Sequence, residues 1–168
     1  MIKEIARNLF NFIFLVLLQV VLLNHVEING LFNPYLYVLF ILLLPFETPK
    51  WLLLVTAFLL GLSVDWFSQS LGIHAFASVA MAYVRPHLLD FLAPRDGYDT
   101  GTKPNSEFMG LSWFFRYALI LVLIHHFLLF FIQVFTFYQF FETLLRAILS
   151  SAFTLTLIVL SQLFTLKR

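Results

Sequence analysis

The residue most clearly placed to do chemistry is Asp65, an acid near the end of a long apolar run. It lies in the stretch GLSVDWFSQSLGIHA, residues 61–75, between Gly61 and the turn glycine Gly72. A carboxylate near hydrocarbon costs roughly 1 to 3 kcal/mol on insertion scales, so it needs a structural or a functional reason. One reading is a proton-coupled carboxylate or a substrate contact, as in many transporters. We favour the simpler reading, in which Asp65 pairs with the polar loop 68–70 or caps the following helix.

A second candidate site is the pair His125 and His126, near the middle of another apolar run. Neighbouring helical positions point about 100° apart, so the two rings cannot meet one metal ion as an i, i+4 pair does. We expect neutral histidines that are hydrogen-bonded to other helices, with a proton relay or a metal site as the alternatives. His74 and His87 fall near expected helix ends, where an interfacial position is expected.

The sequence carries none of the common enzyme motifs. It contains no HExxH, no GxSxG and no phosphate-binding loop, and it has no cysteine for a disulfide or a thiolate metal site. The run DTGTK at residues 99–103 resembles a phosphorylation sequence only in scrambled order. The net charge is +1, and no cluster of Lys and Arg suggests a nucleic-acid surface. We therefore expect a protein that is not an enzyme, needs no cofactor and binds no nucleic acid.

The composition predicts which kind of element positions these residues. Hydrophobic residues make up 61% of the chain and charged residues 11%, with 22 Phe, which is more apolar surface than a soluble domain of this length can bury. We expect an all-α integral membrane protein, with six transmembrane helices in a single domain over residues 1–168. The expected spans are about 8–24, 31–46, 51–66, 73–92, 113–135 and 143–166, with a hydrophilic cytoplasmic loop at 93–112.

Several local signals refine these spans. The first run is read as an uncleaved helix, since no small-residue cleavage site follows it. Pro34 is suited to the start of the second span, and Ala57 and Gly61 are spaced to let another helix approach closely. Small side chains in the fourth span predict packing among other helices, and Arg85-Pro86 suggests a kink that lets it continue. The last span carries a small and polar stripe for helix packing: Ala147, Ser150, Thr154 and Ser161.

Orientation follows from the cations, because short cytoplasmic loops accumulate Lys and Arg. With the N-terminus inside, nine of the ten Lys and Arg fall on or near the cytoplasmic side, and only Arg146 falls outside. Six spans then place both termini in the cytoplasm. Glu142 precedes Arg146 by four residues, the favoured order for a helical ion pair, so we expect these two to pair.

The stretch 61–75, with Gly61, Asp65, Gly72 and His74, resembles the signature region of the MreD family of rod shape-determining membrane proteins. The likeness covers most of the chain. It extends to the basic N-terminus, Pro34, the pair Arg85-Pro86, the loop RDGY at 95–98, and His125-His126 followed by LLFF at 128–131.

The resemblance implies a scaffold in the bacterial cytoplasmic membrane. Members of the family work with MreC and, through it, with the MreB filament, the RodA glycosyltransferase and a class B penicillin-binding protein in peptidoglycan synthesis during cell elongation. The family fold is also similar to the six-helix substrate-binding subunits of energy-coupling-factor vitamin transporters, which implies an alternative function in binding a small vitamin-like molecule. The candidates for partner contact or structural roles are Gly61, Asp65, Gly72, His74, Arg85, His125, His126, Glu142 and Arg146.

Overall fold

In the described part of the chain, residues 2–26, 33–99, 101–136 and 138–166 of a computed structural model, every regular element is helical. The first is α1 (Ile2–Leu17), which continues through a π-helical turn, η1 (Leu18–Leu22), and a 3₁₀ turn, η2 (Leu23–His25). A 3₁₀ turn, η3 (Leu36–Val38), leads into the short helix α2 (Leu39–Leu43). The remaining helices are α3 (Lys50–Ser68), α4 (Ile73–Phe91), α5 (Ser106–Met109), α6 (Leu111–Val134) and α7 (Phe140–Leu166).

Four helices among the described residues are long and apolar enough to cross a membrane. They cover Ala6–His25, Lys50–Ser68, Leu111–Val134 and Phe140–Phe164. Their outer faces expose large apolar side chains, such as Phe10, Val55 and Phe58. So much exposed apolar surface fits hydrocarbon and not water, which agrees with the membrane class expected from the composition.

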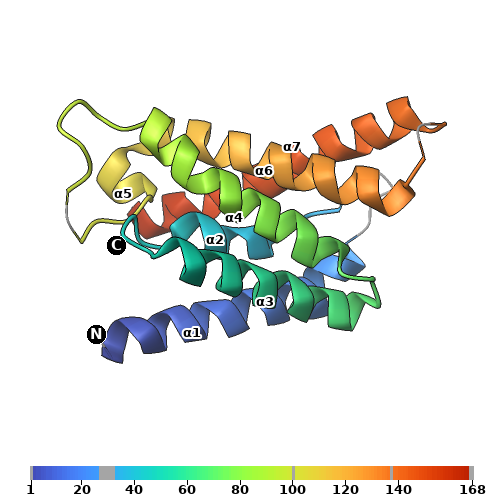
Figure 1. Cartoon of the computed structure of the whole chain (residues 1–168), viewed down its shortest axis with the longest axis horizontal. Coiled ribbons are helices and arrows are strands. Elements are labelled where there is room, and N and C mark those ends of the chain that lie inside the picture. The colour runs from blue at the N-terminus through green and yellow to red at the C-terminus, as the bar shows by residue number, and fades with distance from the viewer. Residues whose placement is uncertain (1, 27–32, 100, 137, 167–168) are drawn as a thin grey trace.

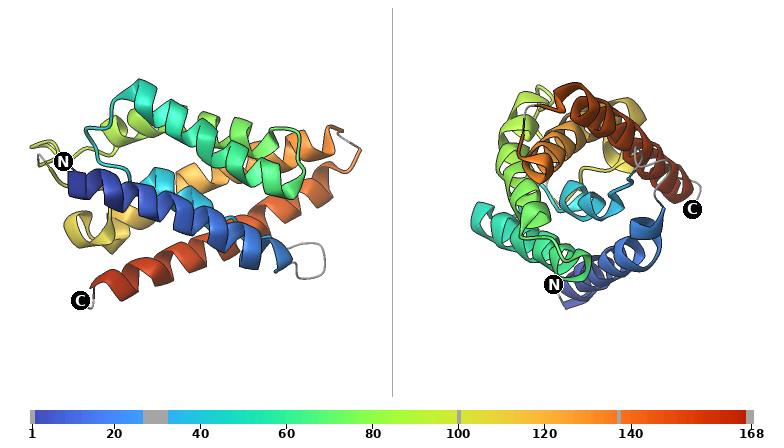
Figure 2. Two further views of the ribbon diagram at one scale, coloured as in Figure 1. Left: turned by 90° about the horizontal axis from the view of Figure 1, so that it is seen from below. Right: turned by 90° about the vertical axis from the view of Figure 1, so that its right-hand side faces the viewer.

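The helices form an elongated bundle with two distinct ends (Figure 1). The beginning of α1, the end of α7, the α2–α3 turn and the α4–α5 connection lie at one end, which we call the terminal end. The α3–α4 and α6–α7 turns lie at the other, which we call the turn end. Viewed along the bundle, α1, α3, α4, α6 and α7 surround α2 (Figure 2).

The second apolar run differs from the expected continuous span over 31–46. Of its described part, only Leu36–Val38 and Leu39–Leu43 are helical, and the backbone is extended again at Leu44. Tyr37, Val38, Ile41 and Leu42 are completely buried. The composition of this run predicted a transmembrane span because a helix enclosed by protein on all sides is as apolar as one that faces lipid. Pro34 therefore precedes a short buried helix, and positions 31 and 32 lie outside the described residues.

The close approach of α3 and α4 at Gly61 is confirmed. A Cβ atom at this position would lie 2.5 Å from both the Cα of Ala75 and the carbonyl oxygen of His74. Only glycine lets the two backbones come this near. The fourth helix also continues past Arg85 and contains Pro86, as expected for 73–92.

The last two helices lie close to the expected bounds, with α7 beginning three residues before position 143. The connection 92–105 is mostly exposed, as expected for the loop 93–112, but it is anchored to the bundle. The rest of that expected loop is helical, because it contains α5 and the start of α6, and Ser106 is buried. The Tyr98 ring stacks on Phe46, with centroids 4.1 Å apart, and its hydroxyl donates to the carbonyl oxygen of Leu89 at 2.7 Å. Burial raises the pKa of Tyr98 to about 12, so the hydroxyl keeps its proton and this bond at neutral pH.

Candidate functional site

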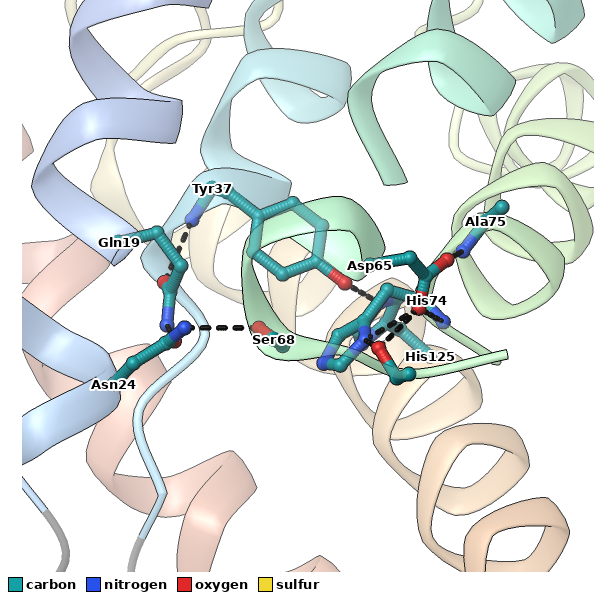
Figure 3. A network of polar contacts seen from close by, with 9 residues as sticks. Gln19, Asn24, Tyr37, Asp65, Ser68, His74, Ala75 and His125 are labelled. Carbon is teal, nitrogen blue, oxygen red and sulfur yellow. Dashed lines mark hydrogen bonds and ion pairs between the residues drawn. The ribbon is translucent and has the colours of Figure 1, made fainter. Parts of the chain in front are cut away.

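Asp65 is the centre of a polar cluster at the α3–α4 turn (Figure 3). One carboxylate oxygen accepts from the Ser70 hydroxyl, from the His74 backbone N–H at 3.1 Å and from His74 Nδ1 at 2.9 Å. The other oxygen accepts from the Ala75 backbone N–H at 2.8 Å. These two N–H groups belong to the first turn of α4, where helices lack internal acceptors. Both structural expectations for Asp65, pairing with the polar loop and capping the next helix, are therefore confirmed.

The turn geometry that brings the acid to this helix start depends on two left-handed residues. Gln69 has φ of 53° and Gly72 has φ of 84°. Glycine adopts this conformation without the steric cost that a Cβ brings, which explains why Gly72 directly precedes α4. The cluster buries both members of its acid–imidazole pair: Asp65 is 2% exposed and His74 is 8% exposed. The His74 ring, which was expected at an interface because it is near a helix end, turns inward to the carboxylate.

The Asp65, His74 and Ser70 side chains do not have the geometry of a hydrolytic triad. In a triad the acid and the nucleophile bind opposite nitrogens of the imidazole. Here Ser70 Oγ lies 3.1 Å from Nδ1, the same nitrogen that contacts the carboxylate. The serine also gives its proton to the acid, so it is not activated as a nucleophile.

The two central histidines bind different helices, as expected. His125 Nε2 lies 2.7 Å from the Tyr37 hydroxyl on η3. His126 Nδ1 lies 2.9 Å from the Val122 carbonyl oxygen, to which it must donate, and this leaves Nε2 to accept from the Thr154 hydroxyl on α7 at 3.0 Å. The described residues contain no group of three or more His, Cys, Asp or Glu that can hold a metal ion.

Side chains from α7 and η1 satisfy the backbone before the buried helix. The N–H of Asn33 donates to Ser150 Oγ at 3.1 Å, and that of Tyr35 donates to Thr154 Oγ1 at 3.0 Å. The Gln19 side chain donates to the Pro34 carbonyl oxygen at 2.9 Å and accepts from the Tyr37 N–H at 3.5 Å. The polar stripe on the last span therefore does more than pack: it supplies hydrogen bonds to non-helical backbone, which has no water partners in a membrane.

Arg85 donates hydrogen bonds to the backbone at the other end of the buried helix. It is 1% exposed, and its Nη2 donates to the carbonyl oxygens of Leu44 and Pro45. Its Nε donates to the Tyr117 hydroxyl at 2.8 Å, which in turn donates to the Leu42 carbonyl oxygen at 3.1 Å. A cation also suits the negative end of a helix. The sequence makes Arg85 a candidate for a partner contact or a structural role, but it does not predict the burial of Arg85 or its carbonyl partners, and it does not single out Gln19. The one available signal was a polar residue inside an apolar run.

The expected ion pair between Glu142 and Arg146 is absent from the structure, so that prediction is wrong. Glu142 is exposed, whereas Arg146 turns inward and places its Cζ 5.4 Å from the centre of the Phe130 ring. A cation over an aromatic face is stabilised by the ring quadrupole, and this contact replaces the exposed pair. His87, by contrast, is exposed beside Tyr83, in agreement with an interfacial position.

Two hollows accompany these polar groups. The larger, which we call the lateral groove, has a volume of about 890 Å³ between α6 and α7, and its lining includes Leu111, Phe115, Leu119, Ala152 and Thr156. The smaller, which we call the polar pocket, has a volume of about 350 Å³. It lies where η1, η2, the segment before η3, the α3–α4 turn and the end of α6 meet, and His74 forms part of its wall.

Comparison with known proteins identified no relative. No family model matches the chain, and no curated protein and no solved structure matches it. The hollows and the polar contacts described above are the features of the structure that bear on its function.

Proposed function

We propose that this protein is a non-enzymatic scaffold of the bacterial cell-elongation machinery in the cytoplasmic membrane. In this proposal it binds MreC and, through it, is coupled to RodA, a class B penicillin-binding protein and the MreB filament. The resemblance of residues 61–75 and of the later segments to the MreD family supports this assignment. The observation that carries it is the lateral groove, which has the shape and chemistry to receive a single transmembrane helix of a partner.

The groove is held open by the fold. From the turn end toward the terminal end α6 and α7 diverge, and α5 lies between them where they are farthest apart (Figure 2). The backbone N–H of Ser106 on α5 donates to Gln162 Oε1 on α7 at 3.3 Å, which fixes this wedge. The groove follows α6 from Leu111 to Leu123, a rise of about 18 Å at 1.5 Å per residue.

The lining favours a helix as occupant. Small side chains, Ser151 and Ala152, lie on α7, and aliphatic or aromatic side chains such as Phe115 and Leu119 lie on α6. In a bilayer, helices associate through close packing at small residues, because lipid tails are as apolar as leucine. The small residues Ser151 and Ala152 let a partner backbone approach this part of the α7 wall.

The arrangement of the bundle ends agrees with a membrane scaffold whose termini are cytoplasmic. The α2–α3 turn and the α4–α5 connection lie at the terminal end of the bundle, where Lys50 begins α3 and the connection carries Arg95 and Lys103. The positive-inside rule then places this end in the cytoplasm, where it can face the filament. The α3–α4 and α6–α7 turns face outward in this proposal.

A matched pair of threonines provides the test. Thr156 lies in the groove and Thr56 lies on α3, and each hydroxyl donates to the carbonyl oxygen four residues earlier at 2.8 Å. Thr156→Phe places a large ring in the groove. The resulting overpacking makes the free energy of MreC binding less favourable by about 1.4 kcal/mol or more, which weakens MreC capture about tenfold or more. Thr56→Phe is the control and retains capture. Equal co-purification of MreC with both variants from detergent-solubilised membranes contradicts the proposal.

A further inference from the structure

The polar pocket is a second hollow with a different chemistry from the lateral groove. Its volume of about 350 Å³ corresponds to roughly a dozen water molecules at about 30 Å³ each, and it falls at the lower end of the range for small-molecule sites. The polar members of its wall are Gln19, Asn24, His25, Asn33, Ser68, Ser70, His74 and Gln133. An occupant of the polar pocket is therefore recognised through hydrogen bonds. Its binding does not require an occupant in the lateral groove.

The pocket lies at the break in the second apolar run, because Asn33, Pro34 and Tyr35 form part of its wall. Non-helical backbone at membrane depth is found only where it is buried in protein or lines a cavity, and broken helices of this kind form binding sites in transporters. The backbone groups of the break already have partners on η1 and α7. These backbone groups therefore need no hydrogen bond from a ligand. The groups in the pocket that still lack hydrogen-bond partners are on side chains.

Two hydrogen-bond acceptors in the pocket wall lack donors. The side-chain oxygen of Asn33 is buried and has no hydrogen-bond partner. His74 donates through Nδ1 to the Asp65 carboxylate, so in the neutral ring Nε2 is an acceptor, and no described residue donates to it. A buried acceptor without a donor, such as the Asn33 oxygen, is destabilising, so an occupant that brings N–H or O–H groups is favoured.

The wall of the polar pocket also disfavours a charged occupant. None of the described residues of its wall is an Asp, Glu, Lys or Arg. The nearest acid, Asp65, already accepts from Ser70, from both N–H groups of His74 and from Ala75. An ion that enters the pocket therefore loses hydration and gains no carboxylate, ammonium or guanidinium counter-charge from the described wall. Tyr35 and Phe67 add aromatic surface for an apolar part of the occupant.

We propose that the polar pocket binds an uncharged group that presents two N–H or O–H donors, a primary amide or a pair of neighbouring hydroxyls, to Asn33 and His74. The group belongs either to a small soluble molecule or to the headgroup of a lipid, since the pocket lies beside the α3–α4 turn, at the turn end of the bundle. This goes beyond the scaffold proposal, because the pocket and the groove have no residue in common.

Saturation-transfer NMR on the purified full chain in detergent tests the recognition chemistry. Benzamide, which has two N–H donors, is expected to bind, and benzoate, which has the same ring with a charged acceptor group, is not. Asn33→Leu removes one acceptor and weakens benzamide binding about three- to tenfold. Gln139→Leu, on the exposed α6–α7 turn, is the control and leaves binding unchanged. The comparison of the two probes needs no variant and so stands even if Asn33→Leu does not fold.

Native mass spectrometry of protein extracted directly from membranes separates the two sources. A retained lipid that is lost in Asn33→Leu and kept in Gln139→Leu identifies a headgroup, whereas benzamide binding without such a lipid identifies a soluble ligand. Either result supports the site. Equal binding of benzamide and benzoate, or no binding of benzamide together with a lipid content that Asn33→Leu does not change, overturns it.

Discussion

Replacing Asp65 by Asn measures how much the carboxylate stabilises the α3–α4 turn. The asparagine keeps one acceptor oxygen and puts an NH₂ group where the other oxygen accepts from the Ala75 N–H at 2.8 Å. A buried N–H left facing a donor costs about 1 to 3 kcal/mol. The three remaining bonds lose their charge assistance, about 1 kcal/mol each, so the free energy of unfolding falls by about 4 to 6 kcal/mol in total.

Thermal unfolding in detergent, followed by tryptophan fluorescence, is a suitable assay because Trp66 directly follows Asp65. For a chain of this length each 1 kcal/mol lowers the midpoint by about 2 to 4 °C, so Asp65→Asn is expected to lower it by roughly 8 to 24 °C. Asp96→Asn, at an exposed position in the α4–α5 connection, is the control and changes stability by less than about 0.5 kcal/mol. If Asp65→Asn unfolds at the same temperature as the control, the capping role is refuted.

Three further substitutions test the other buried contacts by the same assay. Gly61→Ala pushes a Cβ against α4 and is expected to lower the free energy of unfolding by about 1 to 3 kcal/mol. Ser63→Ala, on the neighbouring face, is the control and is expected to change it little. Equal unfolding midpoints for the two variants contradict the close packing. Arg85→Lys keeps the charge but loses the guanidinium group that reaches both Tyr117 and the end of α2. The free energy of unfolding is expected to fall by about 1 to 3 kcal/mol. An unchanged unfolding midpoint contradicts the proposed cap. His125→Phe and Tyr37→Phe each leave the other polar group unpaired, so the double variant is expected to lose about 1 kcal/mol less than the sum of the single variants, and strict additivity rules out the bond.

The sequence was most informative where a feature is local. Asp65 lies ten residues or fewer from all the groups that it binds, so its role as a cap of the next helix could be anticipated from a turn with Gly72 directly ahead of an apolar run. The same holds for Gly61, whose spacing from Ala57 indicated a close helix approach.

The sequence was least informative where partners are far apart in the chain. Gln19 and Arg85 bind backbone 15 and 41 residues away, and nothing in the local pattern around either residue specifies those carbonyl groups. The run 31–46 has the composition of a span, but α2 is a short helix enclosed by the rest of the bundle. Apolar content indicates burial away from water, and it does not distinguish burial in lipid from burial in protein.

Together these contacts suggest a reason for the polar residues inside the apolar chain. Gln19, Ser150 and Thr154 satisfy the backbone before the buried helix, and Arg85 and Tyr117 satisfy the carbonyl groups at its end. The surrounding helices are thereby held around a common centre. A rigid centre of this kind suits a scaffold, because the spacing of α6 and α7 along the lateral groove is then fixed before a partner arrives.

The most direct measurement of the central claim is site-specific crosslinking from the groove in native membranes. The chain has no cysteine, so Ala152→Cys introduces a single attachment point for a maleimide photo-crosslinker, and Val55→Cys on the exposed face of α3 is the matched control. The scaffold proposal predicts a crosslink from position 152 to the transmembrane segment of MreC and none from position 55. Absence of that crosslink from position 152, or equal crosslinking from both positions, contradicts it.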